Sequence, residues 1–303
     1  MTTLTLNRSA RQEFLIGLAI AISGAILFSG KAIVAKLIYR YPVDAVTLLA
    51  FRMLFSVPVF AAVALWQGKS AAPLSHAERA QIVVLGLLGY YLASFLDFLG
   101  LQHISAGLER LILFLTPSFV LLLSSLIFKR RISRFEWGAL AMSYLGTVFV
   151  FLHDVNTGSP NLALGAILVL GSALSYACYL LFSGELVKRI GAMRLVAYAM
   201  CVSSFACIGQ FFLLRPLSML VQPAAIYGLS LFNAVFCTVL PVFMTMIAVA
   251  RIGAGTAALA GMVGPVSTLL LGAVILNEPI TGIQLAGTAL VLSGMYLLSK
   301  KKT

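Results

Sequence analysis

The sequence predicts an all-helical (all-α) polytopic membrane protein whose ten transmembrane helices form two five-helix repeats of inverted topology. Three observations carry this prediction: the composition, the spacing of the apolar stretches and an internal similarity. Of the 303 residues, 61% are hydrophobic and 10% are charged, whereas soluble domains are about half apolar and about one quarter charged. Together with a mean hydropathy of +1.04, this composition predicts a chain embedded in a lipid bilayer.

Ten stretches are apolar over about the 20 residues that a membrane-spanning helix needs. In chain order they are 14–38, 43–66, 80–101, 107–128, 137–153, 163–186, 195–214, 225–249, 255–276 and 282–299. The connections between them are too short to fold as separate domains. Binding or chemistry is therefore expected within the membrane helices or at their ends.

The loop charges predict the orientation of the chain. If the N-terminus is cytoplasmic, 15 basic residues fall on the cytoplasmic side and three on the opposite side, in agreement with the positive-inside rule. The cytoplasmic group is Arg8, Arg11, Lys69, Arg79, Lys129, Arg130, Arg131, Arg134, Lys188, Arg189, Arg194, Arg251, Lys300, Lys301 and Lys302, and the opposite group is Lys36, Arg40 and Arg215. We expect both termini in the cytoplasm. The net charge of +12 thus indicates a lipid bilayer as partner and not nucleic acid.

The second half of the sequence repeats the first. A shift of 148 positions, without a gap, places Gly107 on Gly255 and Pro117 on Pro265. The units are predicted as 1–154 and 155–303. Because each contains an odd number of spans, the second unit must cross the bilayer in the opposite sense. Inverted repeats are typical of secondary transporters, in which the substrate site lies near the midplane between the halves.

Specific motifs within this pattern resemble a known family. They are the first-span stretch AILFSGKAIVAK (25–36) with Pro42 and Arg52 after it, the repeated small-residue opening, mid-helix proline and closing glycine, and Glu278 before Pro279. These features resemble the drug/metabolite transporter superfamily, and within it the ten-helix EamA-type exporters. The sequence is most similar to bacterial amino-acid exporters, including the aromatic amino-acid type. Lys129-Arg130-Arg131 departs from the pattern, since the family often has an acidic residue at that turn.

Five ionisable residues within the predicted spans are candidates for a role in transport, all in the first repeat: Lys31, Arg52, Asp97, Glu109 and Arg110. A charge at a helix centre costs about 2.5 to 3.5 kcal/mol on insertion scales, so such groups face the bundle interior and have partners. The corresponding positions of the second repeat are uncharged. Two hypotheses remain open: a structural ion-pair network, or a gating or substrate-binding role, with Arg52, Glu109 and Arg110 as the gating or ion-pair candidates.

Helical spacing predicts which side chains surround a central cavity, because residues at i, i+4 and i+7 share one helix face. Tyr90, Ser94 and Asp97 form one such polar stripe. The complete set of cavity candidates is Phe28, Lys31, Tyr90, Ser94, Asp97, Leu113, Phe114, Tyr176, Tyr179, Thr238, Thr245 and Gly261. For the small residues and the tyrosines, close helix packing is the alternative interpretation.

Prolines predict irregular helices near the cavity. Proline removes a backbone hydrogen bond and kinks a helix. Pro117 and Pro265 occupy equivalent positions of the two repeats, and Pro241 lies in the eighth span. We expect helix kinks at all three.

The functional prediction is a secondary transporter of the bacterial cytoplasmic (inner) membrane that exports small amphipathic metabolites, amino acids including aromatic ones, by alternating access. A passive facilitator, or an exporter of other metabolites or drugs, remains the alternative. An intramembrane enzyme is disfavoured because HExxH, DxxxD and GxSxG are absent, and neither a cofactor nor a metal site is expected. Without a Walker motif, ATP is not the direct energy source. Protons are the candidate coupling ion, with Asp97 and Glu109 as carriers, and the sequence leaves the oligomeric state open.

Overall fold

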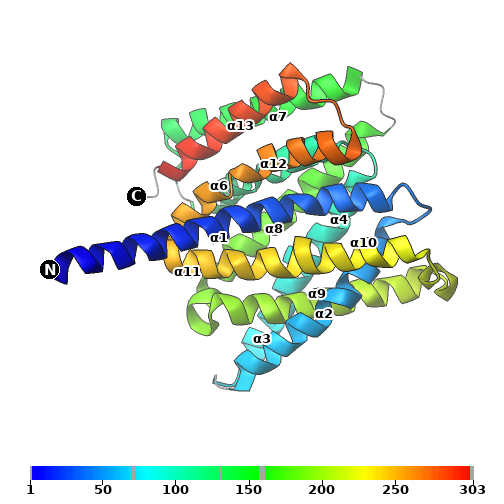
Figure 1. Cartoon of the computed structure of the whole chain (residues 1–303), viewed down its shortest axis with the longest axis horizontal. Coiled ribbons are helices and arrows are strands. Elements are labelled where there is room, and N and C mark those ends of the chain that lie inside the picture. Colours follow the sequence, from blue (N-terminus) through cyan, green and yellow to red (C-terminus); the bar gives the residue numbers. More distant parts are fainter. Residues whose placement is uncertain (1, 70–71, 130, 157–160, 301–303) are drawn as a thin grey trace.

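The computed structural model describes residues 2–69, 72–129, 131–156 and 161–300, and the regular elements within them are all helices (Figure 1). Nine helical segments of this part of the chain are long and apolar enough to cross a membrane, and Gly282–Leu298 is a shorter apolar helix. The ten predicted helices are therefore confirmed in number and order. Arg130, Lys301 and Lys302, which the sequence assigns to the cytoplasmic side, lie outside the described residues.

The ten spans are built from thirteen α-helices and several tighter or wider helical turns within the described residues. Spans 1 to 5 consist of α1 (Thr2–Ile38), α2 (Ala45–Lys69), α3 (His76–Gly86) with η1 (Leu87–Leu92) and α4 (Ala93–Leu101), α5 (Ala106–Leu113) with α6 (Thr116–Phe128), and α7 (Arg134–Asn156). Spans 6 to 10 consist of α8 (Leu162–Ile190), α9 (Ala192–Leu214), α10 (Ala224–Ala234) with η3 (Val235–Val239) and α11 (Leu240–Ala260), α12 (Val263–Leu271) with η4 (Gly272–Leu276), and α13 (Gly282–Lys300). A short 3-10 turn, η2 (Leu217–Leu220), follows span 7.

The two halves run in opposite directions and share their backbone irregularities. In Figure 1, α1 and α8, the first helices of the two repeats, cross the bundle in opposite senses. The π-helical turn η1 begins at Leu87 and its counterpart η3 at Val235, which are the same position of the repeat. Span 4 is interrupted at 114–115 and span 9 at 261–262. The repeat found in the sequence thus extends to the local backbone.

Two connections are so short that a glycine makes each turn. Gly191 separates α8 from α9 with a φ of +85°. Gly253 has a φ of +78° and divides α11 between spans 8 and 9. Glycine adopts positive φ without the steric penalty that a β-carbon brings. Both turns lie at the end of the bundle where the chain begins, so spans 6 to 7 and spans 8 to 9 are tight helical hairpins.

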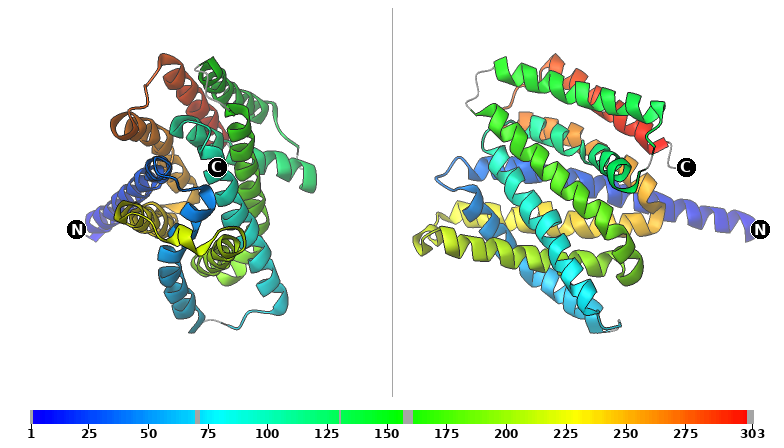
Figure 2. Two further views of the ribbon diagram at one scale, coloured as in Figure 1. Left: turned by 90° about the vertical axis from the view of Figure 1, so that its right-hand side faces the viewer. Right: turned by 180° about the vertical axis from the view of Figure 1, so that it is seen from behind.

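Spans 5 and 10 pair with each other at one edge of the bundle (Figure 2). Their contact is close because glycines face it: a β-carbon on Gly146 would lie 2.5 Å from the carbonyl oxygen of Gly287. Small residues allow such approach between membrane helices. Spans 4 and 9 also meet, since a β-carbon on Gly107 would lie 2.9 Å from a methyl carbon of Leu269. This second contact places the interrupted helices of the two repeats together in the interior.

Candidate functional site

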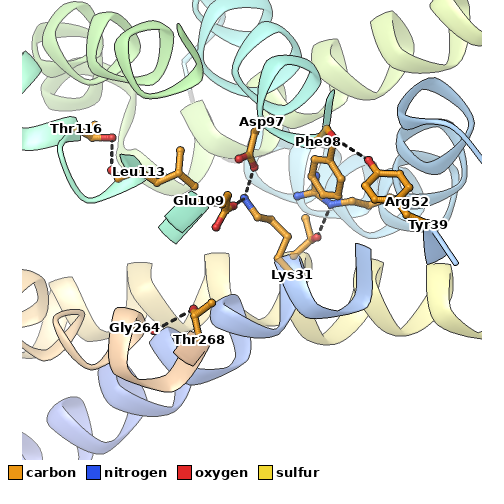
Figure 3. Close-up of polar contacts among 11 residues, drawn as sticks. Lys31, Tyr39, Arg52, Asp97, Phe98, Glu109, Leu113, Thr116, Gly264 and Thr268 are labelled. Carbon is orange, nitrogen blue, oxygen red and sulfur yellow. Dashed lines mark hydrogen bonds and ion pairs between the residues drawn. The ribbon is translucent and has the colours of Figure 1, made fainter. Parts of the chain in front are cut away.

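The five ionisable candidates of the first repeat gather in one buried cluster (Figure 3 labels all of them except Arg110). They come from α1, α2, α4 and α5, and their side chains meet where these helices approach the second repeat. The exposed fractions are 5% for Lys31, 5% for Arg52, 2% for Asp97, 0% for Glu109 and 6% for Arg110. The cluster therefore lies fully inside the protein, where charge needs a partner.

Lys31 holds both carboxylates of the cluster. Its Nζ lies 2.5 Å from Oδ2 of Asp97 and 3.4 Å from Oε1 of Glu109. Oδ1 of Asp97 and both oxygens of Glu109 accept no hydrogen bond from the described residues. Two buried carboxylates thus share one ammonium group. A proton on either carboxylate would balance the charge of this trio.

Arg110 is enclosed by aromatic rings and by a glycine of the second repeat. Its guanidinium carbon lies 5.0 Å from the ring centre of Phe28 and 5.7 Å from that of Phe114, which is cation–π geometry. A β-carbon on Gly264 would lie 2.5 Å from Nη2 of Arg110. Among the described residues, none forms an ion pair or a hydrogen bond with this guanidinium. Arg110 is therefore a buried cation without a bonded anion among the described residues.

Arg52 links the two repeats. Its Nε donates to Oγ1 of Thr238 at 2.8 Å, and that hydroxyl donates to the carbonyl oxygen of Asn233 at 3.0 Å. Arg52 also lies over the ring of Phe98 at 5.0 Å, and Lys31 lies over the same ring at 5.5 Å. The Phe98 carbonyl in turn accepts from the Tyr39 hydroxyl at 2.7 Å (Figure 3). The ring of Phe98 is thus within cation–π distance of both Lys31 and Arg52.

Asn233 is a polar residue of this region that the sequence analysis missed. It is fully buried, and neither its side-chain oxygen nor its nitrogen has a partner among the described residues. A search limited to ionisable residues passes over an amide. Its position inside an apolar span, 230–239, is the signal that could have identified it.

Three tyrosines form a second group, between span 3 and span 6. The ring centre of Tyr90 lies 5.0 Å from that of Tyr179 and 6.3 Å from that of Tyr176. The Tyr90 and Tyr179 hydroxyls are 3.3 Å apart. Gly89 permits this contact, since a β-carbon there would lie 2.3 Å from Cγ of Tyr179.

Two residues of the predicted Tyr90, Ser94 and Asp97 stripe have different partners. Tyr90 packs on α8, whereas Asp97 contacts Lys31 of α1. Tyr90 lies in the π-helical turn η1, and Asp97 lies in α4, the α-helix that follows. Ser94 lies between them and is half-buried.

The remaining cavity candidates differ in their burial and in their hydrogen bonds. Leu113 is half-buried at the end of α5, and its carbonyl accepts from the Thr116 hydroxyl at 2.6 Å. Gly261 lies at the interruption of span 9. Thr245 is exposed, and its hydroxyl donates to the carbonyl of Pro241 within its own helix at 2.8 Å. The hydroxyl of Thr245 is therefore bonded within its own helix and not to the charged cluster.

The prolines stand at the start of helical segments and not in their middle. Pro117 lies in the first turn of α6 and Pro241 in the first turn of α11, directly after η3. Pro265 lies near the beginning of α12. Proline fits a first turn because its missing N–H has no helical partner there. The interruptions of spans 4 and 9 precede Pro117 and Pro265 in both repeats.

A pocket of about 370 Å³ lies near the cluster, at the end of the bundle that the sequence assigns to the outer side. Lys36, Ser105 and Glu278 are among the residues that line it. The carboxylate of Glu278 accepts from the backbone nitrogen of Ala106 at 3.3 Å, at the beginning of α5. Through this hydrogen bond, Glu278 connects the end of span 9 to the helix that carries Glu109 and Arg110. Within the described residues, no group of three His, Cys, Asp or Glu could hold a metal ion.

Comparison with known proteins agrees with this architecture. The model of the EamA-like transporter family matches residues 15–152 and 163–300, two segments whose first residues lie 148 positions apart. An uncharacterized transporter of Bacillus subtilis, YcbK, is 31% identical over 304 residues, which cover 95% of each chain. A probable amino-acid metabolite efflux pump of Salmonella typhimurium is 26% identical and covers 72% of this chain and 78% of its own.

A solved crystal structure extends the likeness to the fold. It has a TM-score of 0.66 at 18% identity and covers 94% of this chain and 98% of its own. At that identity the likeness concerns the fold alone. The two matches to the family model span most of both repeats, and the chain therefore belongs to the EamA-like transporter family of the drug/metabolite transporter superfamily.

Proposed function

We propose that this membrane transporter exports small metabolites that carry a carboxylate next to an apolar or aromatic group, with amino acids as the substrate class. The observation that carries the proposal is the buried guanidinium of Arg110, which lies between Phe28 and Phe114 and forms no ion pair with a described acid. A carboxylate would pair with the guanidinium. An aromatic side chain would pack against the rings.

The charge of the cluster supports an anionic substrate group. Lys31, Arg52 and Arg110 face only two carboxylates, those of Asp97 and Glu109. When all five groups are charged, one positive charge remains inside the membrane, where an uncompensated charge is costly. A bound carboxylate would give the Arg110 guanidinium the anionic partner that it lacks. The relative from Salmonella typhimurium, a probable amino-acid metabolite efflux pump, supports the same substrate class.

Uptake into proteoliposomes tests the substrate class. Labelled phenylalanine should enter vesicles that contain the protein and should not enter empty vesicles. Unlabelled leucine should compete, whereas phenethylamine, which lacks the carboxylate, should not. Arg110→Gln should raise the half-saturating concentration about tenfold or more, the effect of losing about 1.4 kcal/mol of binding. Equal competition by phenethylamine would contradict carboxylate recognition, and the absence of any amino-acid flux would contradict the function.

Proton coupling follows from the sharing of Lys31 by two carboxylates. Release of the ammonium from Asp97 or Glu109 requires a proton to take its place, so a conformational change that moves Lys31 would exchange a proton. An imposed proton gradient should therefore drive uphill movement of the substrate. Glu109→Gln and Asp97→Asn should abolish the uphill component while downhill flux continues. Flux that runs only down the substrate gradient, whatever proton gradient is imposed, would leave a passive facilitator as the mechanism.

The proposed location is the bacterial cytoplasmic membrane, with both termini in the cytoplasm. The distribution of basic residues between the two ends of the bundle supports it. Reporter fusions that are active only outside the cytoplasm should be inactive at either terminus and active within the 39–44 connection. Activity at a terminus would reverse the assignment of the two ends.

A further inference from the structure

A second pocket lies at the opposite end of the bundle from Glu278, between the first turns of span 3 and span 7. It has a volume of about 410 Å³. Leu74, Arg79, Val83, Arg194 and Tyr198 are among its lining residues. This is the end where the chain begins and where most loop arginines and lysines of the sequence fall. The pocket is separate from the charged cluster.

Arg194 is the principal polar group of this pocket. It is only 7% exposed, its Nη2 donates to the carbonyl of Ala72 at 3.0 Å, and its guanidinium lies 5.7 Å from the ring centre of Tyr198. Its Nε is buried and has no hydrogen-bond partner among the described residues. A buried charged group whose donors lack acceptors is destabilising. The guanidinium of a residue that lines the pocket is thus only partly satisfied by the described part of the protein.

The one acidic group at this site is already occupied. Glu78 accepts from the backbone nitrogen and the hydroxyl of Ser75 at 2.8 and 3.0 Å, which forms the capping box of α3. Its second oxygen pairs with Arg189 at 3.0 Å. In the described part of the chain no acid pairs with Arg79 or with Arg194. Arg79 and Arg194 line the pocket and no acidic residue among those described does, so the pocket carries an excess of positive charge.

The wall of the pocket is apolar and continues along the lipid-facing side of span 3. Val83 lines the pocket and is 43% exposed, and the adjacent Val84 is 54% exposed. In a membrane-spanning helix such valines contact acyl chains. A ligand held here would have its anionic end on the arginines and its apolar end along α3. That is the arrangement of a phospholipid at the membrane surface.

We propose that this pocket binds the phosphate headgroup of an anionic phospholipid from the leaflet at this end of the bundle. The phosphate accepts from Arg194 and Arg79, the Tyr198 ring flanks the headgroup, and the acyl chains lie along Val83. The same anionic chemistry is present in free phosphate. The apolar wall favours the lipid, and the experiment distinguishes the two sources.

Lipid binding to the purified transporter in detergent tests the proposal. Native mass spectrometry counts bound lipids as phosphatidylglycerol or phosphatidylcholine is titrated. Phosphatidylglycerol should bind about tenfold more tightly than phosphatidylcholine. Arg79→Gln and Arg194→Gln should each weaken phosphatidylglycerol about fivefold, from the contribution of one arginine to a lipid headgroup. Together the two changes should remove the preference. Arg131→Gln is the matched control, because Arg131 is exposed in the loop before α7 at the same end, and it should bind as the unchanged protein does.

Three results would overturn the proposal. They are equal binding of the two lipids, an unchanged preference in the double variant, and displacement of phosphatidylglycerol by an equimolar concentration of inorganic phosphate, which would assign the pocket to a free anion. If Arg194→Gln does not fold because the contact with Ala72 is lost, Arg79→Gln decides alone, since Arg79 is exposed.

Discussion

The guanidinium of Arg110 lies against the backbone of Gly264, so close that a β-carbon at residue 264 would be 2.5 Å from Nη2. The two residues belong to different repeats, Arg110 to α5 and Gly264 to α12. Gly264 also receives a hydrogen bond from the Ser29 hydroxyl at its carbonyl, at 3.0 Å. The position of the buried cation is therefore set by how closely spans 1, 4 and 9 approach one another.

Gly264→Ala should displace Arg110 and impair transport. The new methyl group occupies the space of the guanidinium, so either the side chain of Arg110 moves or spans 4 and 9 separate. We expect an increase of about tenfold or more in the half-saturating substrate concentration, equivalent to about 1.4 kcal/mol. Gly184→Ala is the control, because nothing lies within 4 Å of the added methyl group. Equal kinetics for the two variants would show that Arg110 does not need this position.

Lys31 and Asp97 provide a test that separates folding from transport. Lys31→Met leaves two buried carboxylates without a cation, and Asp97→Asn weakens the shortest ion pair of the cluster. Removing one partner of a buried pair typically costs about 3 to 5 kcal/mol, whereas replacing both costs far less. Thermal unfolding in detergent should therefore show that the double variant Lys31→Met/Asp97→Asn is more stable than Lys31→Met alone.

Transport by that double variant decides what the pair does. If the pair only supports the fold, recovery of stability should bring recovery of flux. If it takes part in transport, as proposed here, uphill flux should remain absent while the protein is folded. Full uphill transport by the double variant would contradict a functional role.

Thr238 should be more important than Thr245, although both are threonines of span 8. Thr238→Val removes the acceptor of Arg52 Nε and leaves a buried charged donor without a partner, at a cost of about 1 to 3 kcal/mol. Thr245→Val removes a hydroxyl that is bonded only to its own helix, so it should change stability by less than about 0.5 kcal/mol. Similar losses in the two variants would argue against the contact between Arg52 and Thr238.

The contrast between these threonines shows how far the sequence determines the site. Charged residues in apolar spans can be found from the sequence, because charge in hydrocarbon must be buried and paired. The offset of 148 also identified equivalent prolines beside the interruptions of spans 4 and 9. The offset carries no information on how the two halves dock. The contacts of Arg52 with Thr238 and of Arg110 with Gly264 cross that interface and could not be predicted.

The π-helical turns could not be predicted for a different reason. Leu87–Leu92 is six residues long and has no charged residue, so neither an apolar pattern nor a charge marks a change of helical period there. The equivalent turn Val235–Val239 is equally uncharged. Tyr90 within the first of these turns packs against Tyr179, whereas Asp97 in the α-helix that follows pairs with Lys31.

Asp44 and Arg215 provide a prediction at the loops that the sequence assigns to the outer side. The Asp44 carboxylate accepts from the backbone nitrogen of Thr47 at 2.8 Å, at the start of α2, and pairs with Arg215 at the end of α9. Burial alone would raise the pKa of Asp44, but the hydrogen bonds from Thr47 and the charge of Arg215 outweigh burial, so the pKa lies below its usual value. The pair therefore stabilises the folded state when Asp44 is ionised.

The direction of the pH dependence follows from that lowered pKa. The stabilisation is fully present above the unfolded value of about 3.9 and is lost as the pH falls through the lower folded pKa. Asp44→Asn retains a side chain that caps a helix but lacks the charge. It should unfold at a lower temperature than the unchanged protein at pH 7, and the difference should shrink as the pH is brought below about 4. A difference that stays constant from pH 7 to pH 3 would mean that the charge of Asp44 does not contribute, and that its role is confined to the start of α2.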